Sequence, residues 1–142
     1  MYVGYLVNLK QFPNTDTPHI TMLHFKKSEP TPQDLYDLDM ISDEVFHPSG
    51  IVSKSKAVFD SNKVLLLDDG LLATVREAFY SKLMKRNPGL GLLVSNDFRF
   101  RPHVTYNEPE DFKGPNTVDL QTPLVVVWKS QRGVRRIRYL GF

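Results

Sequence analysis

The sequence contains no cysteine among its 142 residues. This absence excludes disulfide bonds, zinc sites built on thiolates and cysteine nucleophiles, and it fits a protein of a reducing compartment. Acid–base and nucleophilic chemistry is left to imidazole, carboxylate, hydroxyl and amine side chains. Any catalytic function of this chain therefore has to be built from those groups.

Long apolar runs are also missing, because no stretch approaches the roughly 18 residues that cross a bilayer. The N-terminal residues, Met1 to Tyr5, lack the basic segment that opens a secretory signal peptide. We therefore expect a cytoplasmic protein with no membrane partner. A content of 41% hydrophobic and 24% charged residues is typical of a globular chain, and the length predicts a single domain over residues 1–142.

Positive charge is scarce except at the C-terminal end. The formal net charge is only +2, and residues 129–142 hold five basic side chains and no acid: Lys129, Arg132, Arg135, Arg136 and Arg138. In the rest of the chain acidic residues outnumber basic ones, so no stable nucleic-acid partner is expected and any anion would be bound locally. The basic ending fits either a solvated edge strand or a rim that attracts phosphate.

Apolar periodicity and turn residues predict seven strands and two helices. The predicted strands span residues 2–9, 19–25, 53–60, 63–67, 101–106, 124–128 and 134–140. Thr31 is expected to cap the first helix, with Pro32 at its first position, and Asp68 or Asp69 to cap the second. This order predicts an α+β fold in which two helices pack on the outside of largely antiparallel sheets.

The first predicted helix is strongly acidic. Residues 29–44 carry six acidic side chains and no lysine or arginine. Leu35, Leu38, Ile41 and Val45 recur at helical spacing and are expected to face the core. We interpret the acids as a solvated outer face rather than as a metal site.

One four-residue pattern occurs in each half of the chain, with its histidines 84 positions apart. The two copies are Pro18-His19-Ile20-Thr21 and Pro102-His103-Val104-Thr105. A single histidine and threonine on a strand would be interpreted as solvent-facing residues, but the repetition is improbable as coincidence. Because side chains alternate along a strand, each copy presents an imidazole beside a hydroxyl on one face.

Two imidazoles can share acid–base chemistry near neutral pH. The unperturbed pKa of histidine is roughly 6.5, so one ring can accept a proton while the other donates one. Neighbouring threonine hydroxyls can donate hydrogen bonds to the non-bridging oxygens of a phosphate held between the rings. The pattern therefore predicts phosphate chemistry that needs neither a metal ion nor a cofactor.

A metal site is the alternative interpretation, with His24 as a third ligand. His24 follows His19 by five positions and would point to the other face of a regular strand, which argues against such a site. His47, beside a proline in a predicted loop, is expected to be a surface histidine.

Two His-x-Thr motifs on strands of a small α+β chain resemble the 2H phosphoesterase superfamily. The resemblance implies a two-lobed fold with a central cleft that holds both motifs. It also implies that His19 and His103 are the general acid and base, and that Thr21 and Thr105 bind phosphate oxygens. Which histidine takes which role stays open.

The compact chain looks most like the phage branch of that superfamily, which defeats CBASS antiphage immunity. The resemblance then implies a phosphodiesterase that cleaves 3′,5′ bonds of cyclic di- and trinucleotide messengers. The alternative enzyme is an RNA-end or 2′,3′-cyclic phosphate phosphodiesterase that acts in RNA processing or repair. A binding module that has kept the fold without turnover is the non-enzymatic alternative.

Nucleobases need flat surfaces, and stacking on an aromatic ring contributes roughly 1 to 3 kcal/mol per base. Tyr5 and Trp128 are the predicted substrate-binding residues, Tyr5 because the first strand borders the cleft in the superfamily. Trp128 ends a strongly apolar strand, which favours core packing over stacking on a base for this residue. Tyr106 follows Thr105 and should face away from the phosphate.

Overall fold

The structure, a computed structural model, describes residues 1–95 and 99–142. In order, the elements formed by these residues are β1 (Tyr2–Val7), η1 (Leu9–Gln11), β2 (His19–His24), α1 (Pro32–Asp43), β3 (Gly50–Phe59), β4 (Asn62–Leu67), α2 (Gly70–Arg86), α3 (Pro88–Gly91), β5 (His103–Thr105), β6 (Thr117–Lys129) and β7 (Arg135–Tyr139). The predicted α+β class is confirmed.

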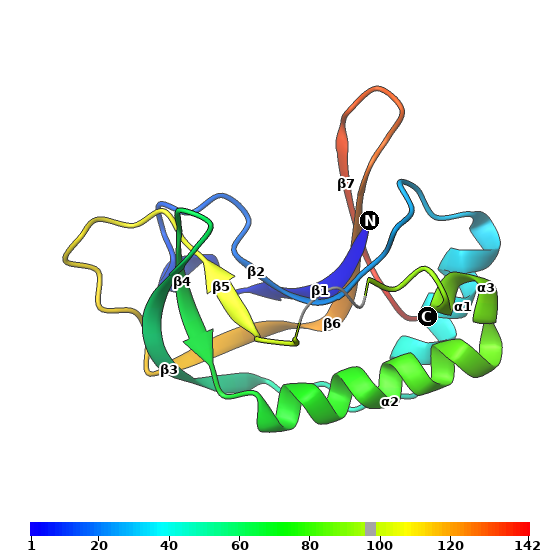
Figure 1. Cartoon of the computed structure of the whole chain (residues 1–142), viewed down its shortest axis with the longest axis horizontal. Helices are drawn as coiled ribbons and strands as arrows, with labels where there is room; N and C mark the ends of the chain where they lie inside the picture. Colours follow the sequence, from blue (N-terminus) through cyan, green and yellow to red (C-terminus); the bar gives the residue numbers. More distant parts are fainter. Residues whose placement is uncertain (96–98) are drawn as a thin grey trace.

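The strands form one antiparallel sheet with the order β2-β1-β6-β3-β4-β5, and β7 pairs with β6 beside this path. The long strand β6 holds the sheet together. Its residues 117–119 pair with β3, whereas its residues 125–129 pair with β7. The sheet is so strongly curved that its two end strands, β2 and β5, lie against each other (Figure 1).

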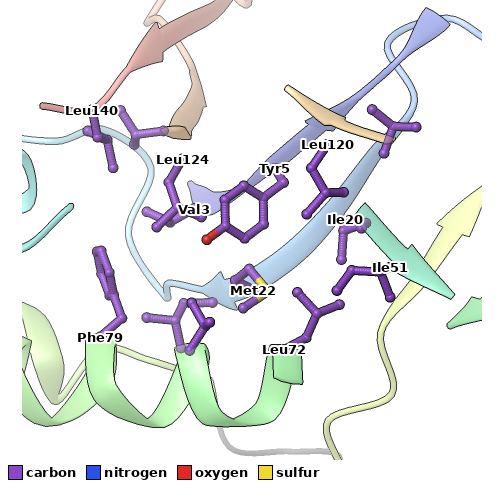
Figure 2. Packing of buried hydrophobic residues seen from close by; sticks show 14 of the residues in the cluster. Val3, Tyr5, Ile20, Met22, Ile51, Leu72, Phe79, Leu120, Leu124 and Leu140 are labelled. Atoms are coloured by element: carbon purple, nitrogen blue, oxygen red, sulfur yellow. The ribbon is translucent and has the colours of Figure 1, made fainter. Parts of the chain in front are cut away.

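Helix α2 covers one face of the sheet and closes the core. Its predicted stripe, Leu72, Val75, Phe79 and Leu83, is buried throughout. Figure 2 shows Leu72 and Phe79 facing side chains of the sheet such as Met22. Burial of this apolar stripe, rather than helix propensity, is what holds α2 in place.

Helix α1 begins as the sequence predicts but buries part of its acidic face. Thr31 and Asp34 form a capping box. Contrary to expectation, Asp34, Asp37 and Asp39 are at most 5% exposed. Each is paired with a cation from another segment: Lys27, Arg86 and Arg138, respectively. Pairing offsets the desolvation of these carboxylates, which the helix sequence alone does not reveal.

A β-bulge interrupts the pairing of β1 with β2. Val3 pairs with Leu23 and Gly4 with Thr21, so β2 carries one extra residue, Met22. Met22 and Leu23 are both buried, which reverses the alternation beyond the bulge. Gly4 allows the close approach of the strands, because a Cβ there would clash with the carbonyl oxygen of Ile20.

None of the helices in residues 1–95 and 99–142 is both long enough and apolar enough to cross a membrane.

Candidate active site

The two histidines occupy equivalent places at the two ends of the sheet. His19 is the first residue of β2 and His103 the first residue of β5. Because these strands contact each other, the imidazoles from opposite halves of the chain lie close enough to interact electrostatically. The fold thus brings together two motifs that are 84 positions apart in the sequence.

Each imidazole is oriented by its own backbone. His19 Nδ1 lies 2.9 Å from the carbonyl oxygen of Thr17, and His103 Nδ1 lies 2.7 Å from the carbonyl oxygen of Arg101. A carbonyl oxygen only accepts hydrogen bonds, so Nδ1 is the donor in both rings. In the neutral state the proton therefore sits on Nδ1, and Nε2 keeps its lone pair. The repeated motif makes the same local structure twice.

The faces of the two rings are covered differently. The Tyr2 ring stacks on His19 with a centroid distance of 4.8 Å and an interplanar angle of 18°. His103 instead meets Phe59 edge to face at 5.0 Å, and the guanidinium of Arg101 lies over the same Phe59 ring at 4.6 Å. Aromatic packing thus fixes each ring plane in addition to the Nδ1 hydrogen bond.

The environment of His19 favours its neutral form. Burial lowers the pKa of His19, and the positive charges of Arg135 and His103 lower it further. The hydrogen bond to the Thr17 carbonyl acts in the opposite direction but does not reverse the shift. A neutral imidazole with its lone pair on Nε2 is able to accept a proton near neutral pH.

Two pockets flank the histidines, and each combines both motifs. One, of about 420 Å³, is lined by His19 and Thr105, together with Lys63. The other, of about 390 Å³, is lined by His103 and Thr21 and by four further polar or charged side chains: His24, Arg76, Ser95 and Arg101. Each pocket therefore offers an imidazole from one half of the chain and a hydroxyl from the other.

The structure places Tyr5 in the core instead of the cleft. Its ring is 0% exposed and lies among the apolar side chains of Figure 2, because Tyr5 shares the core face of β1 with Val3 and Val7. The Tyr5 hydroxyl donates to His47 Nδ1 at 2.7 Å, and His47 Nε2 donates to the carbonyl of Ser42 at 2.8 Å. Both expectations need correction: Tyr5 presents no ring face to a substrate, and His47 is a structural partner.

Trp128 also lies away from the histidines. It is half-buried against the core, next to Val127, whose register partner is Tyr2. Because neighbouring side chains alternate, Trp128 projects from the opposite face of β6 to the one that Tyr2 shares. Tyr106, which alternation predicts to face away from the phosphate, is buried against Phe112 but also lines the pocket of His19 and Thr105.

Sequence reasoning missed Tyr2 and misplaced His24. His24 pairs with Tyr2 and lines the same pocket as Thr21, because the bulge at Met22 returns it to that face. Strand alternation marks Tyr2, which lies one position from the core residue Val3, but no sequence signal marks the bulge. Over residues 1–95 and 99–142, no three His, Asp or Glu side chains are grouped as metal ligands.

Comparison with known proteins identifies a related fold. No protein-family model matches the sequence, and no curated protein matches it. A solved structure, TT0787 of Thermus thermophilus, aligns with a TM-score of 0.60 and 15% sequence identity. The alignment covers 96% of this chain and 94% of TT0787. This likeness over nearly the full length shows that the chain shares the fold of TT0787.

Proposed function

We propose that this chain is a metal-independent phosphodiesterase of two-lobed 2H architecture that cleaves 3′,5′ bonds of cyclic di- and trinucleotides. The observation that carries the proposal is the matched pair of imidazoles. His19 and His103 receive the same Nδ1 restraint from the residue two positions earlier, so the lone pair of each neutral ring is on Nε2. Two such groups on either side of a phosphate are what general acid–base cleavage requires.

His19 is the base of the first step, because its lowered pKa keeps the ring neutral. Its Nε2 removes the proton from the 2′-hydroxyl, and the 2′-oxygen attacks the adjacent phosphorus. The bond from phosphorus to the 5′-oxygen breaks, and His103 donates a proton to that leaving oxygen. The product is a 2′,3′-cyclic phosphate, which water opens with the two histidine roles exchanged.

The threonines stabilise the phosphate as charge develops on its non-bridging oxygens. Thr21 and Thr105 come from opposite halves of the chain and line opposite pockets. Hydroxyls fixed on strands lose little freedom when the transition state forms, so their hydrogen bonds favour that state.

The two pockets support a substrate with a nucleoside on either side of the reacting phosphate. Volumes of about 420 and 390 Å³ fall within the range of small-ligand sites. Opening of cyclic messengers would let a phage evade CBASS immunity, which is the biological role we propose.

The second candidate is an RNA-end or 2′,3′-cyclic phosphate phosphodiesterase. The exposed cations Lys129, Arg132 and Arg136 around the turn between β6 and β7 favour it, because they extend positive charge beyond a compact ligand. The same four motif residues would carry the chemistry, so only the substrate separates the two candidates.

The test is incubation of the protein in EDTA with 3′,3′-cyclic GMP-AMP, cyclic tri-adenylate and an RNA ending in a 2′,3′-cyclic phosphate. Products are followed by chromatography with mass spectrometry. We expect the cyclic nucleotides to open through a 2′,3′-cyclic phosphate, and methylation of the adjacent 2′-hydroxyl to block the reaction. Cleavage of the RNA end alone would support the second candidate, and no turnover would contradict both.

Single His19→Ala and His103→Ala variants are the matched controls. Each is expected to lower kcat by about 10² to 10⁴-fold. Circular dichroism of both variants checks that the fold is retained. A variant that stays folded and fully active would contradict the assignment of that histidine.

A further inference from the structure

The face of the sheet that carries Thr21 continues beyond the two pockets, across β1 and β6 to β7. Thr21 pairs with Gly4, Gly4 with Val125 and Val125 with Tyr139. Directly paired residues in antiparallel strands point to the same face. The row of paired residues that begins at Thr21, the proposed phosphate-binding threonine, therefore lies on one face of the sheet and ends at Tyr139.

A second row runs beside the first. Tyr2, which stacks on His19, pairs with Val127, and Val127 pairs with Ile137. Val127 is only 4% exposed, whereas Ile137 is 40% and Tyr139 48% exposed on the outermost strand. An aromatic ring and an aliphatic side chain thus lie open to solvent on the face that carries the site.

The helices do not cover this face. Arg138, which alternates with Ile137 and Tyr139, points to the other side and forms a two-bond ion pair with Asp39 of α1. The β6–β7 hairpin projects from the body of the molecule in Figure 1. Its open face is therefore accessible from the side of the histidines.

On the same face, toward the turn of the β6–β7 hairpin, the side chains are positively charged. The next register pair after Val127 and Ile137 on this side is Lys129 with Arg135. Lys129 is exposed, and Arg135 reaches Thr17, whose carbonyl orients His19. The surface thus combines an exposed tyrosine with cations next to a phosphate site, which is the chemistry that recognises nucleotides.

The distance between Thr21 and Tyr139 determines which nucleotide of the substrate can contact this surface. Three strand spacings separate Thr21 from Tyr139, which is roughly 14 Å at about 4.8 Å per strand. The nucleosides that flank the reacting phosphate are accommodated by the two pockets beside the histidines. A base on Tyr139 therefore belongs to a further nucleotide.

We propose that the exposed face of β7, made by Ile137 and Tyr139 with Lys129 at its edge, binds a third nucleotide of the substrate. The proposal rests on the proposed phosphodiesterase function for its catalytic consequence. This third-nucleotide site predicts a higher kcat/KM for substrates of three or more nucleotides than for cyclic dinucleotides. The base stacks on Tyr139, and the phosphate of that nucleotide meets the Lys129 ammonium.

The catalytic test compares kcat/KM for cyclic tri-adenylate and for 3′,3′-cyclic GMP-AMP in an Ile137→Ala, Tyr139→Ala double variant. Loss of one stacked base is expected to lower the value for the trinucleotide about tenfold, with the dinucleotide within about twofold. Tyr36→Ala is the matched control, because Tyr36 on α1 is 49% exposed and lies away from the site. Equal losses on both substrates, or none, would overturn the proposal.

A binding test separates this proposal from the proposed function. Linear tri-adenylate and di-adenylate are titrated into a His19→Ala, His103→Ala protein with and without the β7 substitutions. We expect the β7 substitutions to weaken tri-adenylate binding about tenfold and to leave di-adenylate unchanged. No selective weakening refutes the third-nucleotide site whatever the hydrolysis result, whereas selective weakening without any turnover refutes only the phosphodiesterase.

Discussion

Arg135 donates a 2.7 Å hydrogen bond to the hydroxyl of Thr17, the residue whose carbonyl oxygen holds Nδ1 of His19. Thr17 has φ +49, an unfavourable backbone conformation for a β-branched residue. The strained carbonyl position is therefore secured by a side chain from β7. Through this contact the C-terminal hairpin orients the proposed general base.

Replacement of Arg135 is expected to shift the acid limb of the pH profile of kcat/KM to higher pH. Arg135 lowers the pKa of His19, so its loss raises that pKa and the deprotonated base appears only at higher pH. The limb of Arg135→Gln should therefore lie at higher pH than that of the wild type. Arg135→Lys keeps the positive charge and should leave the limb in place, and identical profiles for all three proteins would contradict this role.

Removal of either threonine hydroxyl is expected to slow turnover rather than weaken substrate binding. Thr21→Val and Thr105→Val keep the side-chain shape, and each should lower kcat about 10²-fold with little change in KM. Steady-state kinetics on the cleaved cyclic nucleotide measures both parameters. A rise in KM at constant kcat would instead assign the hydroxyl to ground-state binding.

Gly4 is expected to be intolerant of a side chain. In Gly4→Ala the new Cβ meets the carbonyl oxygen of Ile20, which forces β1 and β2 apart beside Thr21. Overpacking of this kind costs about 3 kcal/mol of unfolding free energy. Urea denaturation measures it, with Gly70→Ala as control because a Cβ there finds ordinary contact at 3.8 Å. Equal stability of the two variants would refute the argument.

Tyr5→Phe tests whether Tyr5 supports the fold or the substrate. The substitution removes the hydroxyl that donates to His47 and keeps the buried ring. We expect a loss of about 1 kcal/mol in the free energy of unfolding and no change in kcat/KM. An unchanged free energy of unfolding with a lowered kcat/KM would instead show that Tyr5 acts in the site.

The ion pair between Asp39 and Arg138 should matter for stability more than any other charge of the C-terminal segment. Arg138 donates at 2.8 and 2.7 Å to a carboxylate that is 3% exposed. Arg138→Ala is expected to cost about 2 kcal/mol, less than a fully buried pair because the guanidinium is partly solvated. Arg132→Ala, an exposed turn residue, is the control and should be neutral.

This contribution should also depend on pH. Burial opposes ionisation of Asp39, but the bonds from Arg138 and Gly141 outweigh it and lower the pKa of Asp39. The stabilisation is therefore present above the ordinary aspartate pKa and is lost as the pH falls through the lower folded value. The stability gap between wild type and Arg138→Ala should narrow below about pH 4. A constant gap would contradict the assignment.

Local signals were enough to predict much of the fold. Thr31 caps α1 as its sequence indicates, and the apolar spacing of α2 identifies its buried stripe. The repeated His-x-Thr pattern located the two imidazoles, because alternation on a short regular strand is a local property. The strands predicted over residues 53–60 and 63–67 correspond to β3 and β4, which pair as a hairpin with its turn at Asp60 and Ser61.

What the sequence did not reveal depends on contacts between distant segments. The face of Tyr5 is set by the register of β1 against β2 and β6, and the face of His24 by the extra residue Met22. The partners of the buried aspartates lie in other elements, up to 99 residues away in the case of Asp39. The first half of β6, with Pro123 and several polar residues, carries no clear strand signal.

Because the end strands β2 and β5 contact each other, the curved sheet resembles a barrel that is open along one seam, between these two strands. Both are end strands of the order β2-β1-β6-β3-β4-β5, and His19 and His103 are their first residues. In the proposed function, a substrate held between the two histidines bridges that seam. Any change in the curvature of the central strands β1 and β6 alters the width of the seam, and with it the spacing of the two histidines.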